Sequence, residues 1–249
     1  PTCLRRAVDL YAAIVPRVVE VSSCDAAEAT KLLENIFRAV NIALVNEVAI
    51  ICKKLKMDVW EVIDAAATKP FGFMPFYPGP GLGGHCIPID PLYLSWVLKS
   101  LNYNARFIEL ASSINGAMPN FVVEMVGDAL NDSQKSLNGS KVLVVGVAYK
   151  RDISDMRESP ALDIIADLRH KKAQVFYHDP YVPVLEVDGG KYVSQPIEGH
   201  NLDQYDCVVI VTDHRCFDYQ DIVNRSKLVI DTRNATRAVT EGREKIRKL

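Results

Sequence analysis

The sequence has no excess of positive charge, no CxxC pair and no signal-peptide pattern. Its 29 basic and 31 acidic residues leave a net charge of -2, and capture of nucleic acid needs a strong basic excess, so we expect no nucleic-acid partner. The six unpaired cysteines predict reduced thiols, a cytoplasmic protein and no metal site. No apolar run reaches the length that spans a bilayer, so we expect no membrane association.

The 249 residues, 49% of them hydrophobic, suffice for one large domain or two modest ones. The chain begins with Pro1 and has no initiator methionine. A helix-like segment over 4–14 and a short apolar strand over 18–21 resemble the tail of an α/β unit whose earlier strands are absent. We therefore expect residues 1–24 to be the remnant of an N-terminal domain, in a fragment of a longer protein.

Residues 25–136 carry the spacing of helices. From 25 to about 56 there is no proline or glycine, and apolar residues recur around most of the surface, which predicts a helix buried in a core or against a partner subunit. Asp25 and Glu28, after two serines, have the spacing of a capping box. Further helices are predicted over 58–67, over 91–99 with Asp90 as N-cap, and over 106–136 with a break at Gly116 and Pro119.

The pattern changes at Gly139. Lys141–Val147 is a continuous apolar run of the kind found in strands buried on both faces of a parallel sheet. A helix is predicted over 160–170, and further strands are predicted over 175–177, 207–211 and 228–230. This alternation indicates a Rossmann-like, doubly wound parallel-sheet α/β domain over 137–249, following an all-helical domain.

In such sheets ligands bind outside the carboxyl ends of the strands. A dinucleotide fingerprint needs three glycines after the first strand, whereas this loop has only Gly146, followed by Lys150 and Arg151. Because lysine and arginine side chains hold a diphosphate by themselves, we favour a nucleotide-diphosphate site over basic residues on a surface loop. The candidate strand ends are Ala148–Asp152, His178–Asp179, Thr212–Arg215 and Asp231–Asn234.

The most unusual stretch is the loop Pro78–Pro91, which has four glycines and four prolines in fourteen residues. Such a composition excludes a helix interior and a central strand. The loop contains one thiol, Cys86, and a carboxylate, Asp90, four residues later. It is either a functional loop or a connector with an incidental cysteine. The aromatic run Lys69–Tyr77 before it is either a hydrophobic plug or a surface on which a flat ring stacks.

Three motifs resemble those of the UDP-glucose/GDP-mannose dehydrogenase family. The resemblance covers 18–234, nearly the whole chain. The segment Lys69–Gly81 is similar to the branch that acts on UDP-N-acetylglucosamine or related UDP-N-acetylhexosamines. The three motifs are Gly83–Asp90 around the thiol, Lys31 and Asn35 with Asn46-Glu47 downstream, and Tyr149–Asp152 with Asp155–Pro160.

The resemblance implies an enzyme of three domains. These are an NAD-binding domain, a helical central domain that forms a homodimer, and a C-terminal domain that binds UDP; here they correspond to 1–24 (a remnant), 25–136 and 137–249. The implied reaction is the NAD-dependent, four-electron oxidation of the sugar C6 hydroxymethyl to a carboxylate, for surface polysaccharide precursors. The glycine fingerprint for NAD is missing, so we expect this chain alone to be inactive.

The resemblance also implies roles for individual residues. Cys86 would add to the intermediate aldehyde and then form a thioester that water cleaves. Lys31 would stabilise the oxyanion, Asn35 would donate a hydrogen bond beside it, and Asp90 would activate water or hold Lys31. Gly83 and Gly84 would let sugar and cofactor approach. The expected contacts to the UDP-sugar are Phe76, Tyr77, Leu82, Gly83, Lys150, Arg151 and Arg233.

Two positions depart from the family pattern. Many members carry a second basic residue where this chain has Asn41, so oxyanion stabilisation would depend more on Lys31. Many have a small residue where His85 stands, and this histidine either lowers the pKa of the thiol or simply packs. Two alternatives stay open: a dehydrogenase of UDP-glucose or UDP-N-acetylmannosamine, and a non-catalytic module that binds a nucleotide sugar and dimerises.

Overall fold

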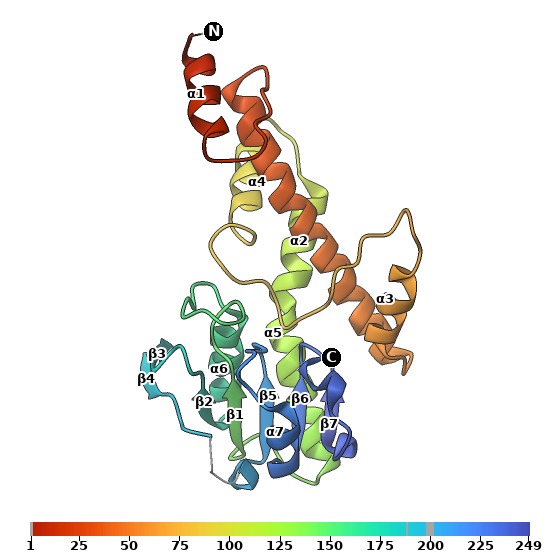
Figure 1. Ribbon diagram of the computed structural model, residues 1–249. Helices are drawn as coiled ribbons and strands as arrows, with labels where there is room; N and C mark the ends of the chain where they lie inside the picture. Colours follow the sequence, from red (N-terminus) through yellow and green to blue (C-terminus); the bar gives the residue numbers. More distant parts are fainter. Residues whose placement is uncertain (1, 188, 198–201) are drawn as a thin grey trace.

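The computed structural model describes residues 2–187, 189–197 and 202–249; residue 1, the first of the expected remnant, lies outside them. Figure 1 shows an elongated helical part joined to an α/β part. The helical part consists of α1 (Thr2–Ala12), α2 (Cys24–Lys54), α3 (Val59–Ala67), α4 (Asp90–Ser100) and α5 (Arg106–Asp132). The fold class is therefore the predicted one, with helices first and a parallel sheet after them.

The α/β part has one parallel sheet in the order β2-β1-β5-β6-β7 and a small antiparallel hairpin, β3-β4. Helix α6 (Pro160–His170) follows β1, and α7 (Tyr219–Arg225) follows β5. Short 3-10 turns lie at Leu202–Gln204, Ala235–Ala238 and Arg243–Lys245. The strands are β1 (Lys141–Val145), β2 (Gln174–His178), β3 (Val184–Val187), β4 (Gly190–Val193), β5 (Cys207–Ile210), β6 (Val229–Asp231) and β7 (Ile246–Lys248).

The helices begin where short polar side chains satisfy their free amides. Ser23 Oγ accepts from the amide of Ala26 at 3.1 Å, so α2 is capped by Ser23 and not by Asp25. Asp58 caps α3, because its side chain accepts from the amide of Trp60 at 2.9 Å. Asp90, the expected cap of α4, is instead its first residue and makes no cap hydrogen bond; its carboxylate has another partner, described below.

Two further expectations were wrong. Residues 18–21 are not a strand, because no neighbouring strand lies beside them among the described residues to complete a ladder. Helix α5 runs through Gly116 and Pro119 without a break. Because Pro119 has no backbone N–H, the carbonyl of Asn115 lacks its helical donor. That carbonyl lies beside Gly81 of the loop Pro78–Pro91, which we call the thiol loop, 3.4 Å from where a Cβ on Gly81 would stand.

One hydrophobic core joins the two parts. The carboxyl-terminal half of α5 contributes Val122, Val126 and Leu130, all fully buried, and α6 packs against it. The same cluster includes Trp60 of α3 and the buried strand residue Val144. Because α5 runs from beside α4 in the helical part down to the α/β part (Figure 1), it packs against elements of both.

Helix α2 corrects the expectation that no segment could span a bilayer. By length and composition alone its 31 residues, with a mean hydropathy of 1.5 over the most apolar window, would suffice to cross one. Buried helices of soluble proteins pass the same test, and α2 packs against α5 and α4. The helix therefore carries little evidence for a membrane.

Candidate functional site

The thiol loop is fastened to the α/β part through its backbone. The amide of Gly84 donates to the carbonyl of Arg157 at 3.0 Å. Cys86 lies two residues later in a tight turn, where its carbonyl accepts from the amide of Asp90 at 2.9 Å. The Cys86 residue is half-buried, so part of it stays open to solvent.

Two glycines of the loop make room for an aromatic side chain. A Cβ on Gly83 would lie 2.6 Å from Tyr149 Cβ and 2.9 Å from the carbonyl oxygen of Glu158. A Cβ on Gly84, whose φ is +86°, would lie 2.9 Å from Tyr149 Cε2. The absence of side chains at Gly83 and Gly84 therefore lets Tyr149 pack against the loop.

Of the polar residues predicted around the thiol, the structure brings Asn35 and Asp90 together. Asn35, 1% exposed, donates from Nδ2 to Asp90 Oδ2 at 2.8 Å. Lys31, one turn earlier on α2, directs its ammonium to Glu34 at 3.4 Å and is largely exposed. The side chain of Asn35 thus connects α2 to the end of the thiol loop by a direct hydrogen bond.

A buried chain of amides holds the beginning of the loop. Asn46 Oδ1 accepts from the amide of Gly79 at 2.9 Å, and its Nδ2 donates to Asn115 Oδ1 at 2.9 Å. Asn115 donates in turn to the carbonyl of Ala39 at 3.0 Å. These contacts connect α2, α5 and the loop inside the protein, where an unpaired amide would be costly.

Just before Gly79, Tyr77 and Pro78 border a cavity of about 670 Å³ that is rich in arginine. Arg233 lies against Gly79, so closely that a Cβ there would be 2.4 Å from Nη1, and its Nε donates to the carbonyl of Val211 at 3.0 Å. Burial, and then the charge of Arg151, lower the pKa of Arg233 to about 10, against the opposing effect of Asp231. Arg151, Arg215 and Arg237 also line this cavity.

Aromatic rings form another wall of the arginine cavity. Trp60 and Tyr77 stack with ring centroids 5.9 Å apart and planes inclined by 14°. The Tyr77 hydroxyl donates to Asp64 Oδ1 at 2.9 Å, and this hydrogen bond raises the pKa of Tyr77. Phe76, expected beside Tyr77, instead packs edge-on against Phe37 of α2.

Arg151 and Lys150 occupy the loop after β1. The guanidinium of Arg151 pairs with Asp213. The exposed Lys150 lines a smaller hollow of about 390 Å³, which it shares with Arg151 and Arg233. The three basic residues predicted from the sequence therefore meet at the carboxyl edge of the sheet.

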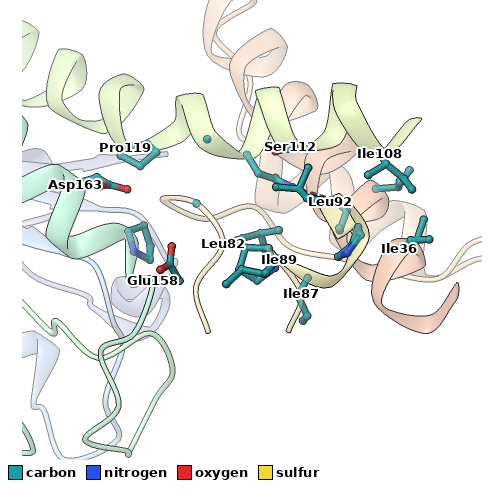
Figure 2. A pocket seen from close by; sticks show the side chains of 18 residues that line it. Ile36, Leu82, Ile87, Ile89, Leu92, Ile108, Ser112, Pro119, Glu158 and Asp163 are labelled. Carbon is teal, nitrogen blue, oxygen red and sulfur yellow. Dashed lines mark hydrogen bonds between the residues drawn. The ribbon is translucent and has the colours of Figure 1, made fainter. Parts of the chain in front are cut away.

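Leu82 faces a different cavity, of about 270 Å³ (Figure 2). Figure 2 shows Leu82, Ile87 and Ile89 of the loop directed into this space, with Ile108 of α5 across from them. Glu158 and Asp163 stand at its other end, and burial raises the pKa of Asp163, aided by the charges of Asp167 and Glu158. The structure thus does not bring Leu82 to the wall that Tyr77 lines.

Several residues that contact the thiol loop or line the arginine cavity had no role assigned to them from the sequence. Asn46, Tyr149 and Arg157 stand inside family motifs, but only the fold shows Asn46 and Arg157 on the loop's backbone and Tyr149 against its glycines. For Trp60, the sequence pattern indicated only a position in the predicted helix over 58–67. Among the described residues, no group of three or more histidine, cysteine or acidic side chains could hold a metal ion.

Comparison with known proteins gives two family models that match this chain in order. Residues 25–117 match the central domain of the UDP-glucose/GDP-mannose dehydrogenase family, and residues 143–238 match its UDP binding domain.

Curated relatives and a solved structure agree with these matches. The chain is 35% identical over 236 residues to UDP-N-acetyl-D-mannosamine dehydrogenase of Methanococcus vannielii, covering 92% of this chain and 52% of that protein. It is 34% identical to NDP-N-acetyl-D-galactosaminuronic acid dehydrogenase of Ralstonia solanacearum, with 94% and 53% covered. The structure of UDP-D-ManNAc dehydrogenase from Pyrococcus horikoshii superimposes with a TM-score of 0.81 at 32% identity, over 95% of this chain and 54% of that one. The chain spans about half the length of the curated relatives it matches.

Proposed function

This chain belongs to the UDP-glucose/GDP-mannose dehydrogenase family, and on that premise we propose that it carries the thiol and the UDP pocket of a UDP-sugar 6-dehydrogenase. The whole protein would oxidise the C6 hydroxymethyl of a UDP-N-acetylhexosamine to the uronate, in the cytoplasm, for surface polysaccharide precursors. One observation supports this most. A single segment, residues 76–91, lines the arginine cavity at its start and carries Cys86 near its end.

The arginine cavity suits a nucleoside diphosphate. Arg233 and Arg151 supply fork-shaped donors for phosphate oxygens, and Lys150 adds a mobile charge beside them. The stacked rings of Trp60 and Tyr77 offer a flat apolar face for a base. Because the segment continues from this cavity to the thiol, a UDP held here would direct its sugar toward Cys86.

Cys86 would carry the second half of the oxidation. Its thiolate adds to the C6 aldehyde to give a thiohemiacetal, loss of a hydride gives a thioester, and water then releases the uronate and restores the thiol. Asn35 donates to Asp90 at 2.8 Å, and this carboxylate would orient the water. Lys31 would have to leave Glu34 to stabilise the oxyanion, and an exposed pair of this kind is worth only about 1 kcal/mol or less.

The reaction needs a hydride acceptor, and members of this family use NAD. The described residues do not form a dinucleotide cradle. Gly146, the single glycine in the loop after β1, lies so close to Thr212 that a Cβ there would be 2.3 Å from its carbonyl oxygen. Gly83 and Gly84 face Tyr149, and their contact with the cofactor stays a prediction. We therefore assign no step of this chain to NAD.

Within the class of UDP-N-acetylhexosamines, two sugars are candidate substrates. The segment Lys69–Gly81 favours UDP-N-acetylglucosamine, whereas the name of the Methanococcus vannielii relative favours UDP-N-acetylmannosamine as a second candidate. The two sugars differ in configuration at C2. Both belong to the class that we propose, and UDP-glucose does not.

The helical part is proposed to form a homodimer. Large apolar side chains are exposed on α4 and at the start of α5, two helices in contact with each other, with Trp96 73% and Phe107 76% exposed. A patch of this kind marks an interaction surface in a soluble protein. A second copy of the chain is the partner that the family resemblance implies.

Calorimetry of UDP binding to this chain tests the pocket. Removing the charge at Lys150 or Arg233 should weaken binding about tenfold or more, while Lys191→Ala on β4 serves as the surface control. Binding that survives the combined loss of Lys150 and Arg233 would refute the pocket. A non-catalytic binding module would also bind UDP, so the thiol needs its own experiment.

NADH formation tests the thiol and the sugar together. The chain would be joined to the NAD-binding half of a relative and supplied with UDP-GlcNAc, UDP-ManNAc and UDP-glucose. Cys86→Ala should abolish net four-electron oxidation, while Cys24→Ala, an exposed cysteine at the start of α2, should leave it intact. Equal rates in both variants would exclude Cys86 as the nucleophile, and a preference for UDP-glucose would overturn the hexosamine assignment.

A further inference from the structure

His214, in the loop after β5, is completely buried between two acidic residues that come from separate segments. Its Nδ1 lies 2.9 Å from the backbone nitrogen of Asp152, and its Nε2 lies 3.0 Å from Asp179 Oδ2. A backbone amide can only donate, so Nδ1 accepts. The ring proton is then on Nε2 and is donated to the Asp179 carboxylate, which fixes a single neutral tautomer.

Asp179 also holds the loop after β1, at the end opposite Asp152. Its Oδ2 accepts from the amides of Val147 at 2.7 Å and Ala148 at 3.1 Å, directly after β1. Burial alone would raise the pKa of Asp179, but the hydrogen bonds from His214 and from these amides outweigh it and hold the pKa below its ordinary value. The carboxylate therefore stays ionised. It accepts directly from one end of the segment 147–152, and it accepts from His214, which in turn accepts from the other end.

The segment between these two ends carries the basic side chains. Lys150 and Arg151 lie between the amides held by Asp179 and the amide held by His214. Asp152 has a φ of +61°, a conformation that is uncommon for a residue with a side chain and persists only where its surroundings enforce it. The amide of Arg215, next to His214, donates to Asp152 Oδ1 at 2.9 Å and secures the same residue.

We propose that His214 is a positioning residue for the diphosphate of the nucleotide sugar. It receives its orientation from Asp179 and fixes Lys150 and Arg151 through the backbone of Asp152. The inference rests on the proposed function, because it assigns the two basic residues to a diphosphate. It adds that their placement depends on a buried acceptor atom, His214 Nδ1, which acts on the same residue as the amide of Arg215.

Two substitutions of His214 test the contributions of its two ring nitrogen atoms separately. His214→Asn places an amide oxygen near the position of Nδ1, so it keeps the acceptor for the Asp152 amide and loses the contact with Asp179. His214→Gln reaches the position of Nε2, so it keeps the contact with Asp179 and leaves the Asp152 amide without its acceptor. Each variant thus removes one buried hydrogen bond, and a purely structural histidine would be damaged similarly by both.

The measurements are UDP affinity by calorimetry, thermal stability, and hydrogen exchange of the Asp152 amide without ligand. We expect His214→Gln to weaken UDP binding about fivefold or more and to accelerate exchange at Asp152, with His214→Asn within about threefold of the unmodified chain. Equal losses of affinity in the two variants, or unchanged affinity and exchange in His214→Gln, would overturn the inference. An unmodified chain that does not bind UDP would instead refute the proposed function.

Discussion

Asn35 on α2 donates a hydrogen bond of 2.8 Å to Asp90, which lies 55 positions further along the chain at the start of α4. Because Asn35 is buried and Asp90 is half-buried, the replacement of Asn35 by alanine leaves a partly buried carboxylate without this donor. We expect Asn35→Ala to lower the free energy of unfolding by about 1–3 kcal/mol. Urea denaturation followed by tryptophan fluorescence measures this, since Trp96 lies on α4.

Asn120→Ala is the matched control for that experiment. Asn120 lies on α5 and donates to Glu124 at 3.0 Å, but this pair is exposed, so water replaces the lost partner. The control should change the free energy of unfolding by no more than about 0.5 kcal/mol. Equal destabilisation by the two substitutions would show that the Asn35–Asp90 contact carries no special stability.

Gly83→Ala should be destabilising because there is no space for a methyl group. Its Cβ would meet Tyr149 Cβ at 2.6 Å and the Glu158 carbonyl oxygen at 2.9 Å, and neither atom belongs to the free end of a flexible side chain. We expect a cost of about 1–3 kcal/mol in the free energy of unfolding, as for other overpacked sites. Gly127→Ala on α5, with no atom within 4 Å, should instead stabilise by up to about 1 kcal/mol. A neutral Gly83→Ala would mean that the thiol loop does not pack on Tyr149.

The core of the fold could be predicted because its signals are local. Val142–Val145 form a continuous apolar run, and Pro160 opens a helix at the expected residue. The strand expected at 18–21 failed because an apolar run becomes a strand only beside a partner. The hairpin β3-β4 and the edge strand β7 carried too little pattern in their three or four residues to be recognised.

The candidate site could be predicted by residue type but not by arrangement. Lys150, Arg151 and Arg233 converge because parallel strands end at one edge of the sheet, which is a property of the fold class. Leu82 and Tyr77 are five positions apart and line different cavities, because the loop turns over between them. Tyr149 against Gly83 is a tertiary contact for which no spacing rule exists.

The apolar face on α4 and α5 predicts a change of oligomeric state. Trp96→Glu puts a charge into the proposed dimer contact, where its desolvation would be unfavourable, so the chain should become monomeric. Sedimentation velocity measures the change directly. Val193→Glu, which alters a 61% exposed residue on β4 of the α/β part, should leave the dimer intact. If the unmodified chain is already monomeric at high concentration, the dimer proposal fails.

Asp179 predicts how stability changes with pH. Hydrogen bonds outweigh burial and hold the pKa of Asp179 in the folded chain below its ordinary value of 3.8. A carboxyl with a lower pKa when folded stabilises the fold fully above the unfolded pKa. That stability is lost as the pH falls through the folded value, so the loss begins below about pH 4.

Asp179→Asn isolates this contribution from those of the other carboxylates. The variant should be less stable at pH 7 by about 1–3 kcal/mol, because an amide cannot replace the ionised acceptor of Val147, Ala148 and His214. The difference between the two chains should shrink as the pH falls from about 4, since the native carboxyl is then protonated as well. Glu186→Gln, in an exposed pair on the hairpin, gives the baseline for a carboxylate without such partners. A difference that stays constant down to pH 2 would show that the ionised form of Asp179 is not what stabilises the loop.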